Sequence, residues 1–124
     1  MIPVAVEDAA RAAGRHLLAP PTRTALDVPG ARTGLAVARA IYLAYARDGR
    51  LHYIGKIDRA GGTAAGRLNE HLRTSRRKRS TWRTLWIVPL AAEMASANVV
   101  ALERSLIRAH HPVGNVQHAG LAGR

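Results

Sequence analysis

Two stretches in the middle of the chain have the hydrophobic pattern of adjacent β-strands. Residues 41–45 (IYLAY) and 51–57 (LHYIGKI) are rich in the aromatic and β-branched side chains that favour strands. Between them, residues 47–50 read Arg-Asp-Gly-Arg, and an Asp-Gly pair flanked by strand-like residues is a strong hairpin signal. The pattern therefore predicts an antiparallel hairpin with Asp48-Gly49 as a two-residue loop.

The N-terminal part of the chain has a different texture. Residues 1–18 are rich in alanine and favour a helix, with acidic residues near its positive end. Residues 19–36 are rich in Pro, Gly and Thr, which favours an irregular arm. We therefore expect a helix and arm over 1–36 and a separate domain over 37–124.

The segments after the hairpin alternate between helix and strand. Residues 63–76 suit a helix, residues 83–90 a third strand, and residues 96–109 a last helix that Pro112 ends. The order β-β-α-β-α predicts an α+β fold, in which a small three-stranded antiparallel sheet is flanked by helices.

The predicted hairpin brings two tyrosines together. With a two-residue loop, Tyr42 faces Gly55 and Ala44 faces Tyr53, and side chains on a strand alternate between the two faces. The two phenols then lie diagonally on one face, beside open space at the glycine. Diagonal tyrosines are also ordinary strand packing, so both interpretations stay open at this point.

Polar residues on the predicted helices add candidate chemistry. Arg67 and His71 are four residues apart and share one helix face, where a solvated surface is the ordinary alternative. Glu103 lies four residues from both Val99 and Ile107, within the apolar stripe of the last helix. An acid in that position needs an ion-pair partner, a metal or a shifted pKa.

The charge of the chain indicates a polyanionic partner. The 124 residues include 19 Lys and Arg against 8 Asp and Glu, which gives a net charge of +11. Nucleic acid is the commonest partner of so basic a domain, through its phosphates. A basic block follows the predicted helix and is expected to hold phosphates: Arg73, Arg76, Arg77, Lys78, Arg79 and Arg83. For the neighbouring Trp82 and Trp86, core packing is the expected role, with base stacking as the alternative.

Several classes of protein are excluded or disfavoured. The chain has no cysteine, which excludes disulfides and thiolate metal sites. No apolar run reaches the roughly 18–20 residues that a membrane span needs, and Glu7 and Asp8 interrupt the start of the chain. We expect a cytoplasmic protein with no membrane partner.

Taken in order, these residues resemble the GIY-YIG nuclease superfamily over about residues 39–118. The first motif reads Ala-Ile-Tyr at 40–42, with Ala in place of the usual Gly. The second motif, Tyr-Ile-Gly at 53–55, is intact, and Lys56 follows it. The family's helix Arg matches Arg67, and the following His of several branches matches His71. Its metal-binding Glu and its late Asn match Glu103 and Asn115.

The resemblance implies a metal-dependent endonuclease that hydrolyses phosphodiester bonds in nucleic acid, with DNA as the expected substrate. It implies Mg²⁺ (or Mn²⁺) at Glu103, Arg67 at the phosphate oxygens, and Tyr42 or Tyr53 orienting or deprotonating the water. His71 would assist proton transfer or hold a phosphate, while Gly55, Lys56 and Asn115 would support the site.

Other functions stay open at this level. A non-catalytic nucleic-acid-binding module with the same fold is one alternative, and a structure-specific or RNA-directed nuclease is another. A domain that docks a second subunit through its N-terminal arm is a third. The chain is expected to act as a monomer or homodimer, with a partner that supplies specificity as a further possibility.

Overall fold

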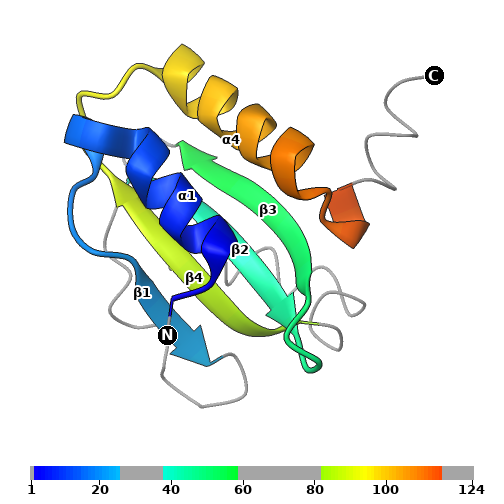
Figure 1. The fold of residues 1–124 in the computed structure, drawn as a ribbon. Coiled ribbons are helices and arrows are strands. Elements are labelled where there is room, and N and C mark those ends of the chain that lie inside the picture. The colour runs from blue at the N-terminus through cyan, green and yellow to red at the C-terminus, as the bar shows by residue number, and fades with distance from the viewer. Residues whose placement is uncertain (1, 26–37, 59–81, 116–124) are drawn as a thin grey trace.

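The structure is a computed structural model that describes residues 2–25, 38–58 and 82–115. Within these residues, two α-helices lie on one face of a twisted four-stranded sheet (Figure 1). The elements in chain order are α1 (Val4–Ala13), a 3₁₀ turn (Gly14–His16), β1 (Thr22–Ala25), β2 (Arg39–Ala46), β3 (Leu51–Asp58), β4 (Trp82–Leu90) and α4 (Ser96–His110). The α+β class is therefore confirmed.

The sheet has the strand order β1-β4-β2-β3, and every neighbouring pair is antiparallel. The three strands predicted from the sequence are confirmed as β2, β3 and β4. The prediction of only three strands is wrong, because β1 forms within the segment expected to be an irregular arm. Only Thr24 of this four-residue strand is buried, so the sequence of β1 lacks the alternating hydrophobic pattern that predicts a strand.

The register of the β2–β3 hairpin agrees with the prediction near the tyrosines. Tyr42 pairs with Gly55, and Ala44 pairs with Tyr53. The turn itself is different from the predicted two-residue loop. The Gly49 N–H donates to the Ala46 carbonyl oxygen at 3.0 Å, and Gly49 has φ of 84°, which places it in the left-handed region. The loop therefore has three residues and ends on a glycine.

The core on the helix face depends on small residues in α1 and branched residues in the sheet. Helix α1 buries Ala5, Val6, Ala9 and Ala13, and these short side chains let the helix approach the sheet closely. The 15-residue helix α4 buries Val99, Leu102 and Leu106 against the same core. The N-terminal helix and β1 thus share one core and one sheet with the elements that follow residue 37.

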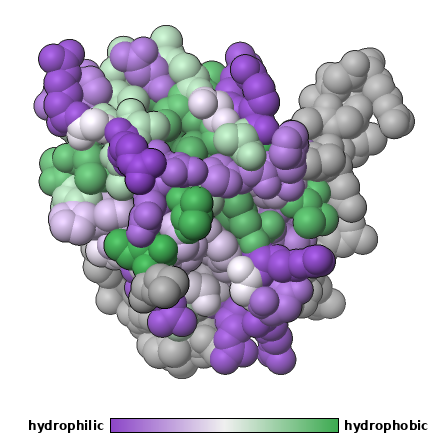
Figure 2. Space-filling model, viewed as in Figure 1, coloured by the Kyte–Doolittle hydropathy of each residue, from purple (hydrophilic) through white to green (hydrophobic). Residues whose placement is uncertain are grey.

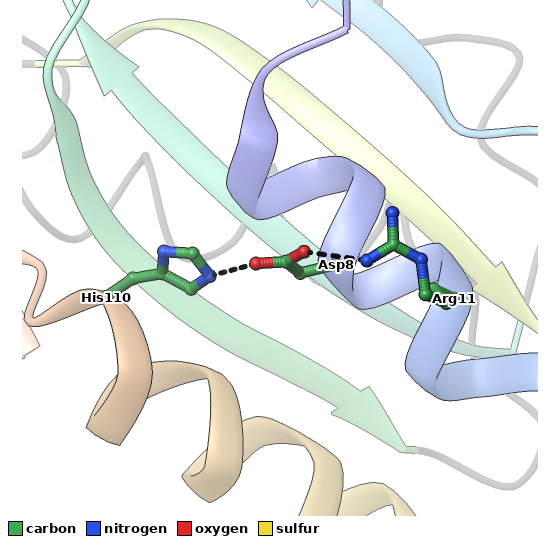
Figure 3. Close-up of polar contacts among 3 residues, drawn as sticks. All are labelled: Asp8, Arg11 and His110. Atoms are coloured by element: carbon green, nitrogen blue, oxygen red, sulfur yellow. Dashed lines mark hydrogen bonds and ion pairs between the residues drawn. The ribbon is translucent and has the colours of Figure 1, made fainter.

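A polar contact also joins the two helices. Figure 3 shows His110 of α4 pointing at Asp8 of α1, with 2.9 Å between His110 Nε2 and Asp8 Oδ2, and Arg11 on the other side of the carboxylate. The His110 contact has the distance of an ion pair but not the angles of a hydrogen bond. Part-exposed pairs of this kind contribute about 0–1 kcal/mol, so apolar packing dominates the docking of α1 on α4.

The C-terminal end of α4 places one further turn against the sheet. His111 adopts a left-handed conformation with φ of 47°, and its N–H bonds to the Ile107 carbonyl oxygen. The helix thus ends just before Pro112, as predicted. Residues 113–115 then form a further helical turn.

The opposite face of the sheet carries a second apolar cluster. It contains Ala40, Tyr42, Ala44, Ile57, Trp82, Leu85 and Ile87, with Tyr53 packed against them. The helix predicted at 63–76 lies outside the described residues, and so the order β-β-α-β-α stays a prediction.

A charged network fixes the loop between β4 and α4 to the end of the hairpin. Arg39 Nε of β2 donates to Asp58 Oδ1 of β3 at 2.7 Å, and the Arg39 guanidinium also donates to the carbonyl oxygen of Ala92. The hydrogen bond from Arg39, followed by one from Ser96 at the start of α4, lowers the pKa of Asp58. A carboxylate beside a helix N-terminus is also favoured by the helix dipole.

Replacing Asp58 with Asn should destabilise the fold by about 1–3 kcal/mol at neutral pH, because it removes charged hydrogen bonds. The folded pKa lies below the unfolded value of about 3.9. The stabilisation is therefore present above that value and is lost as the pH falls through the folded pKa. Urea denaturation at pH 7 and at acidic pH measures this. The exposed Glu93→Gln variant is the control, and a loss of equal size at both pH values would refute the prediction.

Candidate active site

Three aromatic rings cluster on the sheet face opposite the helices. The ring centroids of Tyr42 and Tyr53 are 6.1 Å apart and nearly parallel, while Trp82 lies 6.2 Å from the first and 5.4 Å from the second. Tyr42 and Trp82 are only 5% and 3% exposed, and Tyr53 is half-buried. The core-packing role expected for Trp82 is confirmed.

Gly55 allows the ring of Tyr42 to lie directly on β3. A Cβ atom at this position would fall well inside van der Waals distance of the ring atoms Cζ, Oη and Cε1 of Tyr42. The open space expected opposite Tyr42 is therefore absent, because the ring of the tyrosine itself fills it. The absence of a side chain at Gly55 therefore makes room for the ring of Tyr42 and leaves no empty pocket there.

Glu103 extends from α4 to the outer edge of β3. Its side chain is half-buried, and its carboxylate accepts a hydrogen bond from the backbone N–H of Lys56. Burial is the largest influence and raises the pKa of Glu103, while the charges of Lys56 and Arg104 act in the opposite direction. The carboxylate thus lacks full compensation for its lost hydration.

The side chain of Lys56 belongs to the helix face of the sheet. Lys56 pairs with Ile41, whose side chain lies in the core beneath the helices, so the lysine is on the face opposite the two tyrosines, as the register predicts. Its charge acts on Glu103.

The charge of Glu103 acts on Tyr53 at this edge. Burial raises the pKa of the Tyr53 phenol, and the negative charge of Glu103 raises it further. The surroundings therefore favour the protonated phenol. The role of a base, which the resemblance implies for Tyr42 or Tyr53, needs a lowered pKa, and no described cation is a cause of such a shift at Tyr53. Arg67 lies outside the described residues.

Asn115 binds the backbone of β3 as an additional strand would. Its Oδ1 accepts from the Ile54 N–H at 2.6 Å, and its Nδ2 donates to the Ile54 carbonyl oxygen at 2.9 Å. Asn115 is only 6% exposed. The preceding Gly114 permits this approach, because a Cβ there would lie 2.9 Å from the carbonyl oxygen of His52. Asn115 therefore fixes the outer edge of β3, and its supporting role in a site stays a prediction.

His52 is a neighbour of this cluster that the sequence did not reveal. Tyr45 pairs with Leu51 and Ala44 pairs with Tyr53, so His52 is the inserted residue of a β-bulge. Its Nδ1 accepts a hydrogen bond from Trp82 Nε1 at 3.1 Å. The neutral ring therefore carries its proton on Nε2.

The described residues contain part of the predicted site. Six of these residues lie on or around β3, namely Tyr42, Tyr53, Gly55, Lys56, Glu103 and Asn115, whereas Arg83 lies on β4 and is exposed. The remaining predicted residues lie outside the described part of the chain: Arg67, His71, Arg73, Arg76, Arg77, Lys78 and Arg79. Within residues 2–25, 38–58 and 82–115, no group of three or more His, Asp or Glu is placed to hold a metal.

No family model, curated protein or solved structure matches this chain. In the part of the chain that the structure describes, neither helix is long and apolar enough to span a membrane.

Proposed function

We propose that this chain is a metal-dependent endonuclease of the GIY-YIG type that hydrolyses phosphodiester bonds in nucleic acid, with DNA as its expected substrate. The proposal depends on one observation above all, the half-buried Glu103 carboxylate at the β3 edge, whose charge raises the pKa of the Tyr53 phenol. A half-buried acid with a raised pKa, next to other titratable groups, is characteristic of a functional site.

The chemistry of Glu103 suits a hard divalent cation. Burial disfavours its charged form, and a cation beside it would offset that penalty. Mg²⁺ or Mn²⁺ accepts such a site with a single carboxylate, since water and substrate oxygens supply the other ligands. When bound, the ion would neutralise charge on the phosphate and make a bound water more acidic.

The residues of the chain have distinct tasks in this proposal. Tyr53 keeps its proton at neutral pH and can donate a hydrogen bond to a phosphate oxygen or to the attacking water. Tyr42, fixed on Gly55 and against Trp82, presents a second phenol to the same face. Arg67 would pair with the non-bridging oxygens of the phosphate, and His71 would assist proton transfer.

A nucleic-acid-binding module without catalysis is the second candidate. The observation that favours it is the hydrogen bond between the Lys56 N–H and Glu103, a structural task for the carboxylate that needs no metal. The net charge of +11 supports binding of nucleic acid by both candidates.

Incubation with supercoiled plasmid, and in parallel with single-stranded DNA and RNA, separates the two candidates. With Mg²⁺ or Mn²⁺ we expect nicked and linear plasmid, and with a chelator a rate lower by at least about 10²-fold. Binding measured by gel shift should persist in the chelator. Tyr42→Phe, Tyr53→Phe and Arg67→Ala test the assigned roles. Binding of all three substrates without cleavage by either metal would exclude the nuclease in favour of the binding module.

A further inference from the structure

A groove lies on the helix face of the sheet, beside the start of α1 and the turn of the β2–β3 hairpin. Its volume is about 520 Å³, and Pro3, Tyr45 and Trp86 are among the residues that line it. Tyr45 belongs to the core under the helices and Trp86 packs against that core, which places the floor of the groove on the face opposite Tyr42 and Tyr53. On the helix face, strongly hydrophilic residues stand beside hydrophobic ones (Figure 2).

Three arginines from three different elements line this groove. Arg23 comes from β1, where it pairs directly with Trp86, Arg47 comes from the hairpin turn and Arg83 comes from β4. All three are exposed, and none of the lining residues is acidic. Guanidinium groups in this arrangement favour phosphate, which they can bind through two parallel hydrogen bonds.

The floor of the groove offers an aromatic surface beside these charges. Trp86 is partly exposed and lines the groove next to Arg23, whereas Trp82 is buried in the other cluster. Aromatic rings beside a basic groove bind successive bases of single strands by stacking. In the interior of a duplex, both faces of each base are covered by its neighbours, so an internal paired base cannot stack on an indole. The volume is within the range that holds one small-molecule-sized group.

We propose that this groove binds an unpaired nucleotide of a single-stranded nucleic acid, with its phosphates at Arg23, Arg47 and Arg83 and its base on Trp86. The inference rests on the proposed function for the class of substrate, and it adds a single-stranded segment to that substrate. Because the groove and the tyrosines lie on opposite faces, a strand held in the groove reaches the candidate site only by passing around the sheet.

Fluorescence anisotropy measures binding of labelled nucleic acid to the groove, and a chelator in the buffer prevents metal-dependent cleavage of the probe. The probes are a labelled oligothymidylate of about eight nucleotides, a size within the range of single-strand sites, and a blunt duplex of equal charge whose two strands are joined by a non-nucleotide linker. The double variant Arg23→Ser/Arg47→Ser should bind the oligothymidylate about tenfold more weakly, with less than about a twofold change for the duplex. The control Arg15→Ser/Arg108→Ser removes the same charge from exposed sites outside the groove, and should change both affinities less than about twofold.

Quenching of tryptophan fluorescence reports base stacking on Trp86 and does not depend on the net charge of the protein. The oligothymidylate should quench the wild-type emission, and Trp86→Phe should abolish the quenching while leaving the far-UV circular dichroism unchanged. Three results would each overturn the proposal. The first is an equal loss of oligothymidylate affinity in the two double arginine variants, and the second is an equal loss of affinity for the duplex in Arg23→Ser/Arg47→Ser. The third is competition by polyglutamate as strong as that by the oligothymidylate. If the wild-type protein does not cleave nucleic acid but Arg23→Ser/Arg47→Ser still weakens oligothymidylate binding, only the proposed nuclease function is overturned.

Discussion

Glu103→Gln should reduce the rate of metal-dependent plasmid cleavage about 10²–10³-fold, the loss typical when one charge-stabilising group leaves an active site. The amide oxygen of Gln can still accept the hydrogen bond from the Lys56 N–H, so the edge of β3 keeps its partner. Because burial already disfavours the charged carboxylate, the neutral side chain should leave the thermal stability equal or higher. Time-resolved nicking assays and thermal denaturation on the same preparations measure both effects.

The matched control is Glu93→Gln, which removes one exposed acid from the loop before α4 and should cleave at the wild-type rate. Wild-type cleavage by Glu103→Gln would show that the metal assignment is wrong. A fall in stability together with activity would instead assign Glu103 to the structure.

Gly55→Ala should destabilise the fold by about 1–3 kcal/mol, the usual penalty of an extra methyl group in a filled site. The new Cβ would overlap the ring of Tyr42, which cannot easily move because Tyr53 and Trp82 pack beside it. Guanidinium denaturation gives the change in free energy. The near-UV circular dichroism should also change, because the aromatic cluster must rearrange.

The same substitution in a Tyr42→Ala background tests the cause. Removing the ring opens the space above residue 55, and the penalty of Gly55→Ala should then fall below about 0.5 kcal/mol. An equal penalty in both backgrounds would show that Gly55→Ala destabilises the fold through backbone conformation and not through contact with Tyr42.

The parts of the fold that follow from local periodicity were accessible from the sequence. Period-two alternation predicted the face shared by Tyr42 and Tyr53, and helical spacing predicted Glu103 within an apolar stripe. The predicted register is right for an incomplete reason. The loop is one residue longer than expected, and the bulge at His52 restores the pairing of Tyr42 with Gly55.

The parts that depend on contacts between distant residues were not accessible. Strand β1 exists because β4 supplies hydrogen-bond partners, while its own four residues bury little. The pairing of Asn115 with Ile54 joins positions 61 residues apart, and the contact between His52 and Trp82 depends on the bulge. The groove likewise assembles Arg23, Arg47 and Arg83 from separate strands and a turn, so no window of sequence contains it.

The two polar side chains on the outer edge of β3 have a consequence for self-association. An uncovered strand edge is a template on which a second chain can add, and the side chains of Asn115 and Glu103 occupy the backbone of Ile54 and Lys56 there. Asn115 and Glu103, which the proposed function places at the candidate site, therefore also block the addition of another strand to this edge. Selection for solubility alone would retain both residues, independently of the proposed nuclease activity.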